Sequence, residues 1–95
     1  MKKIIIEEND KIKKKIYKQI NIEEIETTIN ILYNEELLSI YTNKVELQRE
    51  LYKILGEPFK EYKKKRSITG SIWNISLNEK SKISKVILKA NIFEL

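Results

Sequence analysis

The sequence predicts an α+β domain with two layers, in which a four-stranded antiparallel sheet of two hairpins carries helices on one face. Two observations point to this class. Between residues 27 and 95, runs with the character of strands come in pairs, and each pair is followed by an amphipathic stretch with helical spacing. The length of 95 residues suits one small domain. We therefore expect a single ββαββα domain over residues 27–95 and a basic N-terminal segment over residues 1–26.

The first hairpin is predicted from the stretch "TTINILYNEELLSIYT". Ile29, Ile31 and Tyr33 alternate with polar residues, as they would in a half-buried strand. Leu38 and Ile40 alternate in the same way after the polar turn "NEE". Two such runs joined by a short polar turn are typical of a hairpin.

The next stretch, "NKVELQRELYKILGEP", predicts a helix with a signal at each end. Asn43 is a suitable N-cap, and Glu46 follows three residues later as in a capping box. Gly56 favours the left-handed conformation that ends helices, and Pro58 prevents the helix from resuming. The apolar stripe of this helix consists of Leu47, Leu51, Ile54 and Leu55.

The second hairpin is predicted from "FKEYKKKRSITGSIWNISL". We expect "FKEYKKKR" to form the polar strand and "SITG" to form the turn, because Gly70 can adopt a positive φ. Trp73, Ile75 and Leu77 then share one face of the second strand. Trp73 could serve as an exposed stacking or interface residue, but this phase favours a place in the core.

The last predicted helix covers "NEKSKISKVILKA", with Asn78 as its cap. Asn91 should end this helix, and Phe93 and Leu95 should fold back onto the core. The apolar stripe consists of Ile83, Val86, Ile87 and Ala90.

The N-terminal segment allows two interpretations. "KIIIE" is β-branched and suits a short strand. Ile12, Ile16 and Ile20 repeat every four residues, which favours a short helix, although the even spacing of Ile16, Ile20 and Ile22 also suits an extended chain. We favour the helix, after a partly mobile N-terminus.

The composition excludes several kinds of chemistry. The chain has no Cys and no His, which excludes disulfides, thiol nucleophiles, Cys/His zinc sites and Ser-His-Asp triads. Two glycines are too few for a glycine-rich phosphate loop. No apolar run approaches the ~20 residues of a membrane span or the roughly 7–15 of a signal peptide. We expect a non-enzymatic cytoplasmic protein without cofactors.

The net charge of +5 is distributed unevenly. Residues 1–20 hold seven lysines against three acidic residues, and residues 59–95 hold nine basic residues against three acidic ones. Residues 21–58 are acidic, with eight acidic residues against three basic ones. Only Arg49 and Arg66 are arginines, and plentiful Lys, Ile and Asn are typical of an AT-rich genome, so the basic balance does not by itself indicate a nucleic-acid surface.

Four consecutive cations, Lys63, Lys64, Lys65 and Arg66, mark the polar strand of the second hairpin. They could form a phosphate-contacting finger, with Tyr62 or Tyr52 available to stack on a base. They could equally protect an edge strand, because lysine-rich edges discourage the addition of another sheet. The scarcity of arginine favours the protected edge.

A second basic patch lies in the N-terminal segment and could bind an anionic membrane or a nucleic acid. Its apolar side is only one isoleucine wide, so we favour a solvated face and expect no membrane contact. The patch consists of Lys11, Lys13, Lys14, Lys15 and Lys18.

Acidic residues gather around the first hairpin and could suggest paired catalytic carboxylates or a metal site. No Asp accompanies them, and Glu35 and Glu36 fall on an exposed turn, so we interpret them as a docking surface for a basic partner. Tyr33 stands beside this turn and suits an interface. The other acidic residues are Glu23, Glu24 and Glu26.

The stretches "IETTINILYNEELLSIYTNKVELQRELYKILGEP" and "GSIWNISLNEKSKISKVIL" resemble a class of small proteins carried by phages and mobile elements of AT-rich Gram-positive bacteria. The resemblance covers roughly residues 22–90 and lies in "IYTN" before a helix, "GEP" after it and a "W-x-I" strand. It implies an anti-defence factor, such as an anti-CRISPR protein, which binds a host effector and blocks its nucleic-acid channel or its activation. It transfers no functional residues.

We therefore expect an inhibitor that docks on a bacterial effector protein, such as a CRISPR effector. The alternative is a small basic protein that binds nucleic acid through Lys63, Lys64, Lys65, Arg66 and the N-terminal lysines. A homodimer that pairs through an exposed edge strand is also consistent with the sequence.

Overall fold

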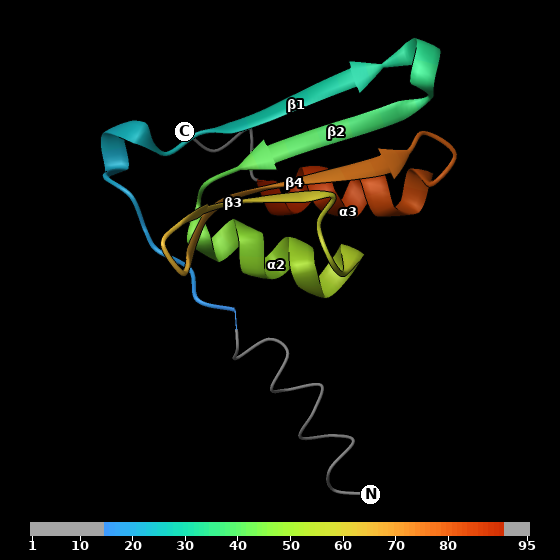
Figure 1. Cartoon of the computed structure of the whole chain (residues 1–95). Helices are drawn as coiled ribbons and strands as arrows, with labels where there is room; N and C mark the ends of the chain where they lie inside the picture. The colour runs from blue at the N-terminus through green and yellow to red at the C-terminus, as the bar shows by residue number, and fades with distance from the viewer. Residues whose placement is uncertain (1–14, 91–95) are drawn as a thin grey trace, which may run out of the picture.

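The computed structural model describes residues 15–90 and confirms the predicted α+β class (Figure 1). Four antiparallel strands form one sheet, and the order of strands and helices matches the predicted ββαββα pattern over the described part of residues 27–95. The elements are β1 (Thr27–Leu32), β2 (Leu37–Thr42), α2 (Val45–Leu55), β3 (Lys60–Lys64), β4 (Ser67–Ser76) and α3 (Lys80–Ala90), with short 3-10 turns η1 (Ile22–Glu24) and η2 (Tyr33–Glu35).

The strand order is β1-β2-β4-β3, so the two hairpins lie side by side with β2 and β4 at the centre. In this central pair Ile40 is opposite Trp73 and Leu38 is opposite Ile75. The pairing of β2 with β4 brings the most apolar strands together, where both can be buried. β1 and β3 are therefore the two edge strands of the sheet.

The core lies between the sheet and the helices, which Figure 1 draws on the same side of the sheet. Trp73 is only 3% exposed, which confirms its prediction as a core residue. Its indole N–H donates a 2.9 Å hydrogen bond to the carbonyl oxygen of Gly56, so the one polar atom of the ring is satisfied. The buried cluster consists of Leu38, Ile40, Leu47, Leu51, Trp73, Ile75 and Val86.

The predicted end of α2 is confirmed, but its predicted cap is wrong. Gly56 ends the helix with φ +81°, and its N–H donates to the carbonyl of Tyr52. The N-cap position is held by Lys44 and not by Asn43. The buried Asn43 side chain instead accepts a 2.7 Å hydrogen bond from the Glu26 N–H and donates a 2.9 Å bond to the Glu24 carbonyl.

The prediction of a turn at "SITG" is also wrong. The chain turns at residues 65–66, where Lys65 takes a left-handed conformation with φ +60°, and Gly70 lies inside β4. Gly70 is required there for another reason: a Cβ atom at this position would lie 2.9 Å from the Tyr41 hydroxyl oxygen. The glycine thus allows the ring of Tyr41 to lie across β4.

The helix α3 begins two residues after its predicted cap, Asn78, which lies in the preceding turn. The first helical hydrogen bond runs from the Ile83 N–H to the Glu79 carbonyl, so Glu79 occupies the cap position and the prediction of Asn78 is wrong. Val86 is fully buried, and Ile83 and Ala90 pack against the core. The expectations for Asn91, Phe93 and Leu95 lie outside the described residues.

The helix favoured around Ile16 and Ile20 is absent from the described part of the N-terminal segment, where residues 15–21 contain no helix. Tyr17 forms a single parallel bridge to Ile68, with a 2.6 Å hydrogen bond from the Ile68 N–H to the Ile16 carbonyl and a 2.9 Å bond from the Lys18 N–H to the Ile68 carbonyl. β2 pairs with β4 only from Ser71 onward, so the extended chain bonds to backbone groups of Ile68 that β2 does not reach. The stretch "KIIIE" lies outside the described residues, and none of the helices within residues 15–90 could cross a membrane.

Candidate binding surface

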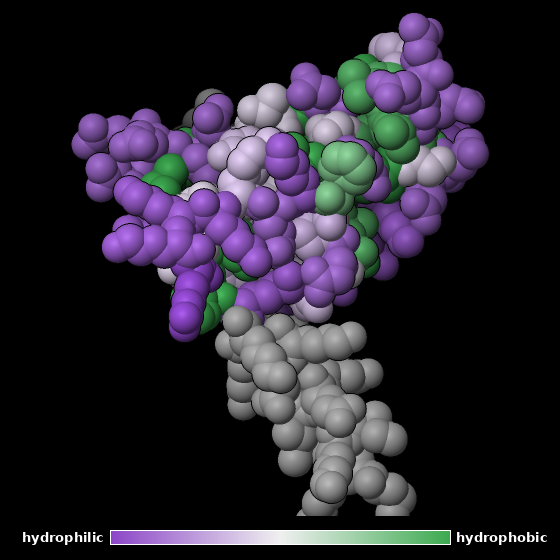
Figure 2. Space-filling view, viewed as in Figure 1, coloured by the Kyte–Doolittle hydropathy of each residue, from purple (hydrophilic) through white to green (hydrophobic). Residues whose placement is uncertain are grey.

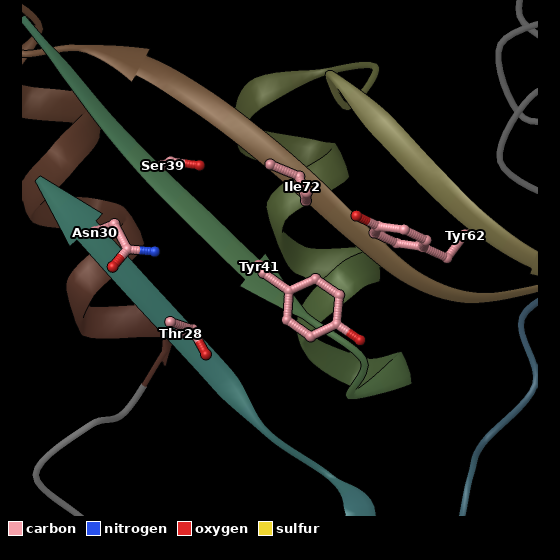
Figure 3. Close-up of a pocket in the computed structure, with 6 residues that line it drawn as sticks. All are labelled: Thr28, Asn30, Ser39, Tyr41, Tyr62 and Ile72. Carbon is pink, nitrogen blue, oxygen red and sulfur yellow. The ribbon is translucent and has the colours of Figure 1, made fainter. Parts of the chain in front are cut away.

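One face of the sheet packs on the helices, and the other has no helix over it within residues 15–90 (Figure 3). In Figure 3 both helices lie behind the strands, and the six labelled side chains lie in front of them. The surface follows from strand alternation, because each of these residues is adjacent in sequence to a residue of the opposite face. We call it the open face and define it by Thr28, Asn30, Ser39, Tyr41, Tyr62 and Ile72.

The open face contains a shallow hollow of about 430 Å³. Within residues 15–90 its lining includes two phenol groups, two hydroxyls, one carboxamide and one apolar side chain, and no charged side chain. Such a surface offers donors and acceptors of hydrogen bonds together with aromatic contact area. The six described residues that line it include neither a nucleophile activated by a base nor a set of metal ligands.

The rings of Tyr41 and Tyr62 are in contact on the open face. Their ring centroids lie 5.9 Å apart at an interplanar angle of 78°, which is an edge-to-face contact. The Lys60 ammonium lies 4.8 Å from the centroid of the Tyr62 ring. Burial, followed by the charge of Glu26, raises the pKa of the Tyr41 phenol above its ordinary value.

Most of the open face was missed by sequence reasoning, which singled out only Tyr62 from this group. Tyr41 lies between Ile40 and Thr42, which are both fully buried, and this alternation was the available signal. Alternation shows that a residue faces away from the core, but it does not show that the exposed residues of neighbouring strands lie together.

The basic run of the second hairpin is exposed at the end of β3 and in its turn. Figure 2 shows this end of the molecule as mostly hydrophilic. Because β3 is an edge strand, the lysines occupy the place where they would hinder the addition of another strand. Tyr62 projects from the same strand onto the open face, whereas Tyr52 lies beside Lys15. The run consists of Lys63, Lys64, Lys65 and Arg66.

The N-terminal lysines differ in their surroundings. The Lys15 ammonium forms ion pairs of 2.9 Å with Glu57 and 2.6 Å with Glu61, so it is not a free surface cation. Lys18 is exposed and shares a hollow of about 250 Å³ with Lys64 and Glu24. The remaining members of the predicted patch, Lys11, Lys13 and Lys14, lie outside the described residues.

The group around Lys15 brings together residue types that occur in active sites. The Tyr52 hydroxyl donates a 3.1 Å hydrogen bond to Glu57, and the Lys15 ammonium lies 5.1 Å from the Tyr52 ring centroid. Burial lowers the pKa of Lys15, but its hydrogen bonds to Glu57 and Glu61 outweigh that effect and raise the pKa to about 12. A lysine nucleophile needs the opposite shift, so this group acts as a structural ion-pair network.

The acidic residues lie at the two ends of β1. Glu23 and Glu24 belong to η1, just before the strand, and Glu26 is the residue that precedes it. Glu35 and Glu36 follow the strand in the turn to β2, where Glu36 has a left-handed conformation. All five are exposed, none forms an ion pair with a residue of the described chain, and no three acidic residues within 15–90 could hold a metal ion.

Tyr33 is 77% exposed at the tip of the first hairpin, and its neighbours Ile31 and Leu32 are also exposed. Figure 2 shows hydrophobic residues gathered near this hairpin. The tip therefore combines an aromatic side chain and aliphatic side chains with the carboxylates of Glu35 and Glu36.

No protein-family model, no curated protein and no solved structure matches this chain. The resemblance to proteins of mobile elements therefore has only the sequence stretches that carry it as support.

Proposed function

We propose that this protein is a non-enzymatic binding protein that docks on another protein through the open face. The observation that carries the proposal is the uncharged set of described residues that line the hollow, which include the Tyr41 and Tyr62 rings in edge-to-face contact. Tyrosine provides a large and rigid contact area, while Ser, Thr and Asn provide adaptable hydrogen bonds; protein-recognition surfaces are rich in this combination. Lys60 lies beside Tyr62, but none of the residues that line the hollow within the described chain is charged, whereas a phosphate-binding surface would need cations in the lining itself.

The proposed partner is a bacterial defence effector, such as a CRISPR effector, whose nucleic-acid binding or activation is blocked by the docked protein. This choice is supported by the resemblance carried by "IYTN", "GEP" and the "W-x-I" strand. The protein would then act in the cytoplasm of the bacterial host.

The test is an inhibition assay with purified CRISPR effector nucleases from Gram-positive hosts at physiological salt. The expected result is that the protein slows cleavage of target DNA and that Tyr62→Ser weakens inhibition at least tenfold. Leu88→Ser is the control, because Leu88 is 77% exposed but lies in α3, which packs on the opposite side of the sheet from the open face. If no effector is inhibited or captured, or if the two variants behave alike, the proposal is wrong.

A second candidate function is the binding of single-stranded nucleic acid. It is favoured by the hollow in which Lys18 and Lys64 come together, beside the exposed Lys63, Lys65 and Arg66. Such binding should weaken steeply with salt, because each phosphate contact releases counterions. Fluorescence anisotropy with labelled oligonucleotides tests this, and the triple change Lys63→Glu, Lys64→Glu and Lys65→Glu should abolish it. Docking through the open face should tolerate the same triple change.

A further inference from the structure

We infer that the outer edge of β1 is a docking site for an extended segment of a basic protein partner, which adds to the sheet as a fifth strand. The inference rests on the proposed function and specifies how part of the partner is held. The partner segment has a neutral, partly apolar centre and Lys or Arg residues at both ends. Three features of β1 carry this inference: its backbone phase, its lack of charge and the charges around it.

The first feature is the direction of the backbone groups. The Asn43 N–H donates to the Glu26 carbonyl, so Glu26 belongs to the set of residues that bond toward β2. Because bonded and non-bonded pairs alternate in an antiparallel ladder, the N–H and C=O groups of the intervening residues point away from β2. These residues are Thr27, Ile29 and Ile31, and within residues 15–90 no strand lies on that side.

The second feature is the contrast between the two edges of the sheet. β3 reads "KEYKK", in which four of five residues are charged, and such side chains repel an additional strand. β1 reads "TTINIL" and has neither a charged residue nor a proline. Ile31 is 47% exposed and Leu32 is 39% exposed, so an added strand would cover apolar surface as well as backbone groups.

The third feature is the ring of carboxylates around this neutral edge. Glu23, Glu24 and Glu26 precede β1, Glu35 and Glu36 follow it, and none is neutralised by an ion pair within residues 15–90. Positive charges at both ends of an incoming strand would complement them, and the same charges would steer its approach.

The same carboxylates argue against a second copy of this chain as the occupant. If the β1 strands of two copies paired antiparallel so that all their outward N–H and C=O groups were bonded, Ile29 would lie opposite Ile29 of the second copy. That pairing would then bring the acidic residues before β1 in one copy toward those after β1 in the other. Like charges in contact disfavour this arrangement, whereas a basic segment would be attracted.

The experiment uses two synthetic peptides, KKTVTVTKK and EETVTVTEE, titrated into the full chain and followed by NMR. The expected result is that the lysine-flanked peptide binds at least tenfold more tightly, that its affinity falls as salt rises, and that the amides of Thr27, Ile29 and Ile31 become protected from hydrogen exchange. Ile31→Pro should weaken binding at least tenfold, because it removes an outward N–H without breaking a bond to β2. Ile31→Val keeps both the N–H and the branched side chain and serves as the matched control.

Equal binding of the two peptides, or unchanged binding by Ile31→Pro, would overturn the inference. So would protection of these three amides in the protein alone, since the edge would then be occupied by the same chain or by a second copy. Sedimentation would separate those two cases. The peptide assay reads only the β1 edge, whereas the effector assay with Tyr62→Ser reads only the open face, so failure of one is distinguishable from failure of the other.

Discussion

Tyr41 on β2 and Gly70 on β4 are matched across the sheet: a Cβ atom on Gly70 would lie 2.9 Å from the Tyr41 hydroxyl oxygen and 3.0 Å from its ring carbon Cε1. The ring can cover β4 only because that position has no side chain. Gly70 is also opposite Tyr62 on β3, so one glycine lies beneath the contact between the two tyrosines. The arrangement of the open face therefore depends on a residue that is not part of its lining.

The close approach of Gly70 and Tyr41 predicts that the effect of Gly70→Ala on stability changes sign when the Tyr41 ring is removed. Gly70→Ala should destabilise the protein by about 1–2 kcal/mol, because the added methyl group displaces the Tyr41 ring. In the background Tyr41→Ser the same change should stabilise by about 0.5 kcal/mol, since alanine loses less backbone entropy than glycine on folding. Urea unfolding of the four proteins measures the coupling. Equal effects in the two backgrounds would contradict the steric explanation.

The role of Asn43 can be tested by distinguishing helix capping from hydrogen bonding to the distant backbone groups of Glu24 and Glu26. Asn43→Ala should lower the free energy of unfolding by about 1–2 kcal/mol, because it leaves the partly buried N–H of Glu26 and C=O of Glu24 without their partners. Asn43→Ser keeps a residue type suited to capping but is too short to bridge the two backbone groups, and residue 43 lies one position before the N-cap, Lys44. We therefore expect the serine variant to be nearly as unstable as the alanine variant in thermal unfolding. Full rescue by serine would show that capping is the main role.

The Lys15 ion pairs predict a loss of stability at alkaline pH. The pKa of Lys15 is raised from 10.5 to about 12 in the folded state. A raised pKa stabilises the fold fully below pH 10.5, and this contribution, about 1–2 kcal/mol, is lost as the pH rises through 12. Lys15→Met should therefore differ most from the wild type near pH 9 and least above pH 12, as measured by urea unfolding. Lys18→Met, which alters an exposed lysine that forms no ion pair within residues 15–90, is the matched control.

A buried polar pair under the sheet, Gln48 and Ser71, predicts that two substitutions are coupled. Ser71 donates a 2.7 Å hydrogen bond to the Gln48 side-chain carbonyl, but the Gln48 Nε2 atom has no hydrogen-bond partner within the described residues. The single changes Gln48→Met and Ser71→Ala should each be destabilising or neutral. The double variant should unfold at a higher temperature than either single variant, because no unpaired polar group remains. A double variant less stable than both would indicate a further partner for Gln48.

Local patterns in the sequence predicted several elements correctly. Trp73 is in phase with Ile75, and both are buried, because strand alternation is a property of the backbone itself. Gly56 ends α2, because few other residues tolerate its conformation. Signals of this kind depend on neighbours in the chain, so they can be recognised without knowledge of the tertiary structure.

The errors have a common physical cause in contacts between residues distant in sequence. Asn43 was predicted as a cap from the residues that follow it, but its side chain bonds to residues 17 and 19 positions earlier. Gly70 was predicted in a turn, but the demand for glycine comes from a tyrosine on another strand. Lys15 was predicted as a surface cation, yet its partners Glu57 and Glu61 lie more than 40 residues away.

The sequence by itself determined the class of the fold, the order of its strands and helices, and the apolar faces that form its core, since each depends on local periodicity. Only the tertiary structure decided which strands are central and which are edges, and hence that Tyr41 and Tyr62 meet on one face. That choice depends on the pairing of β2 with β4, in which Ile40 and Trp73 are more than 30 residues apart. Burial of these distant apolar residues against each other selects the pairing, and no local pattern encodes it.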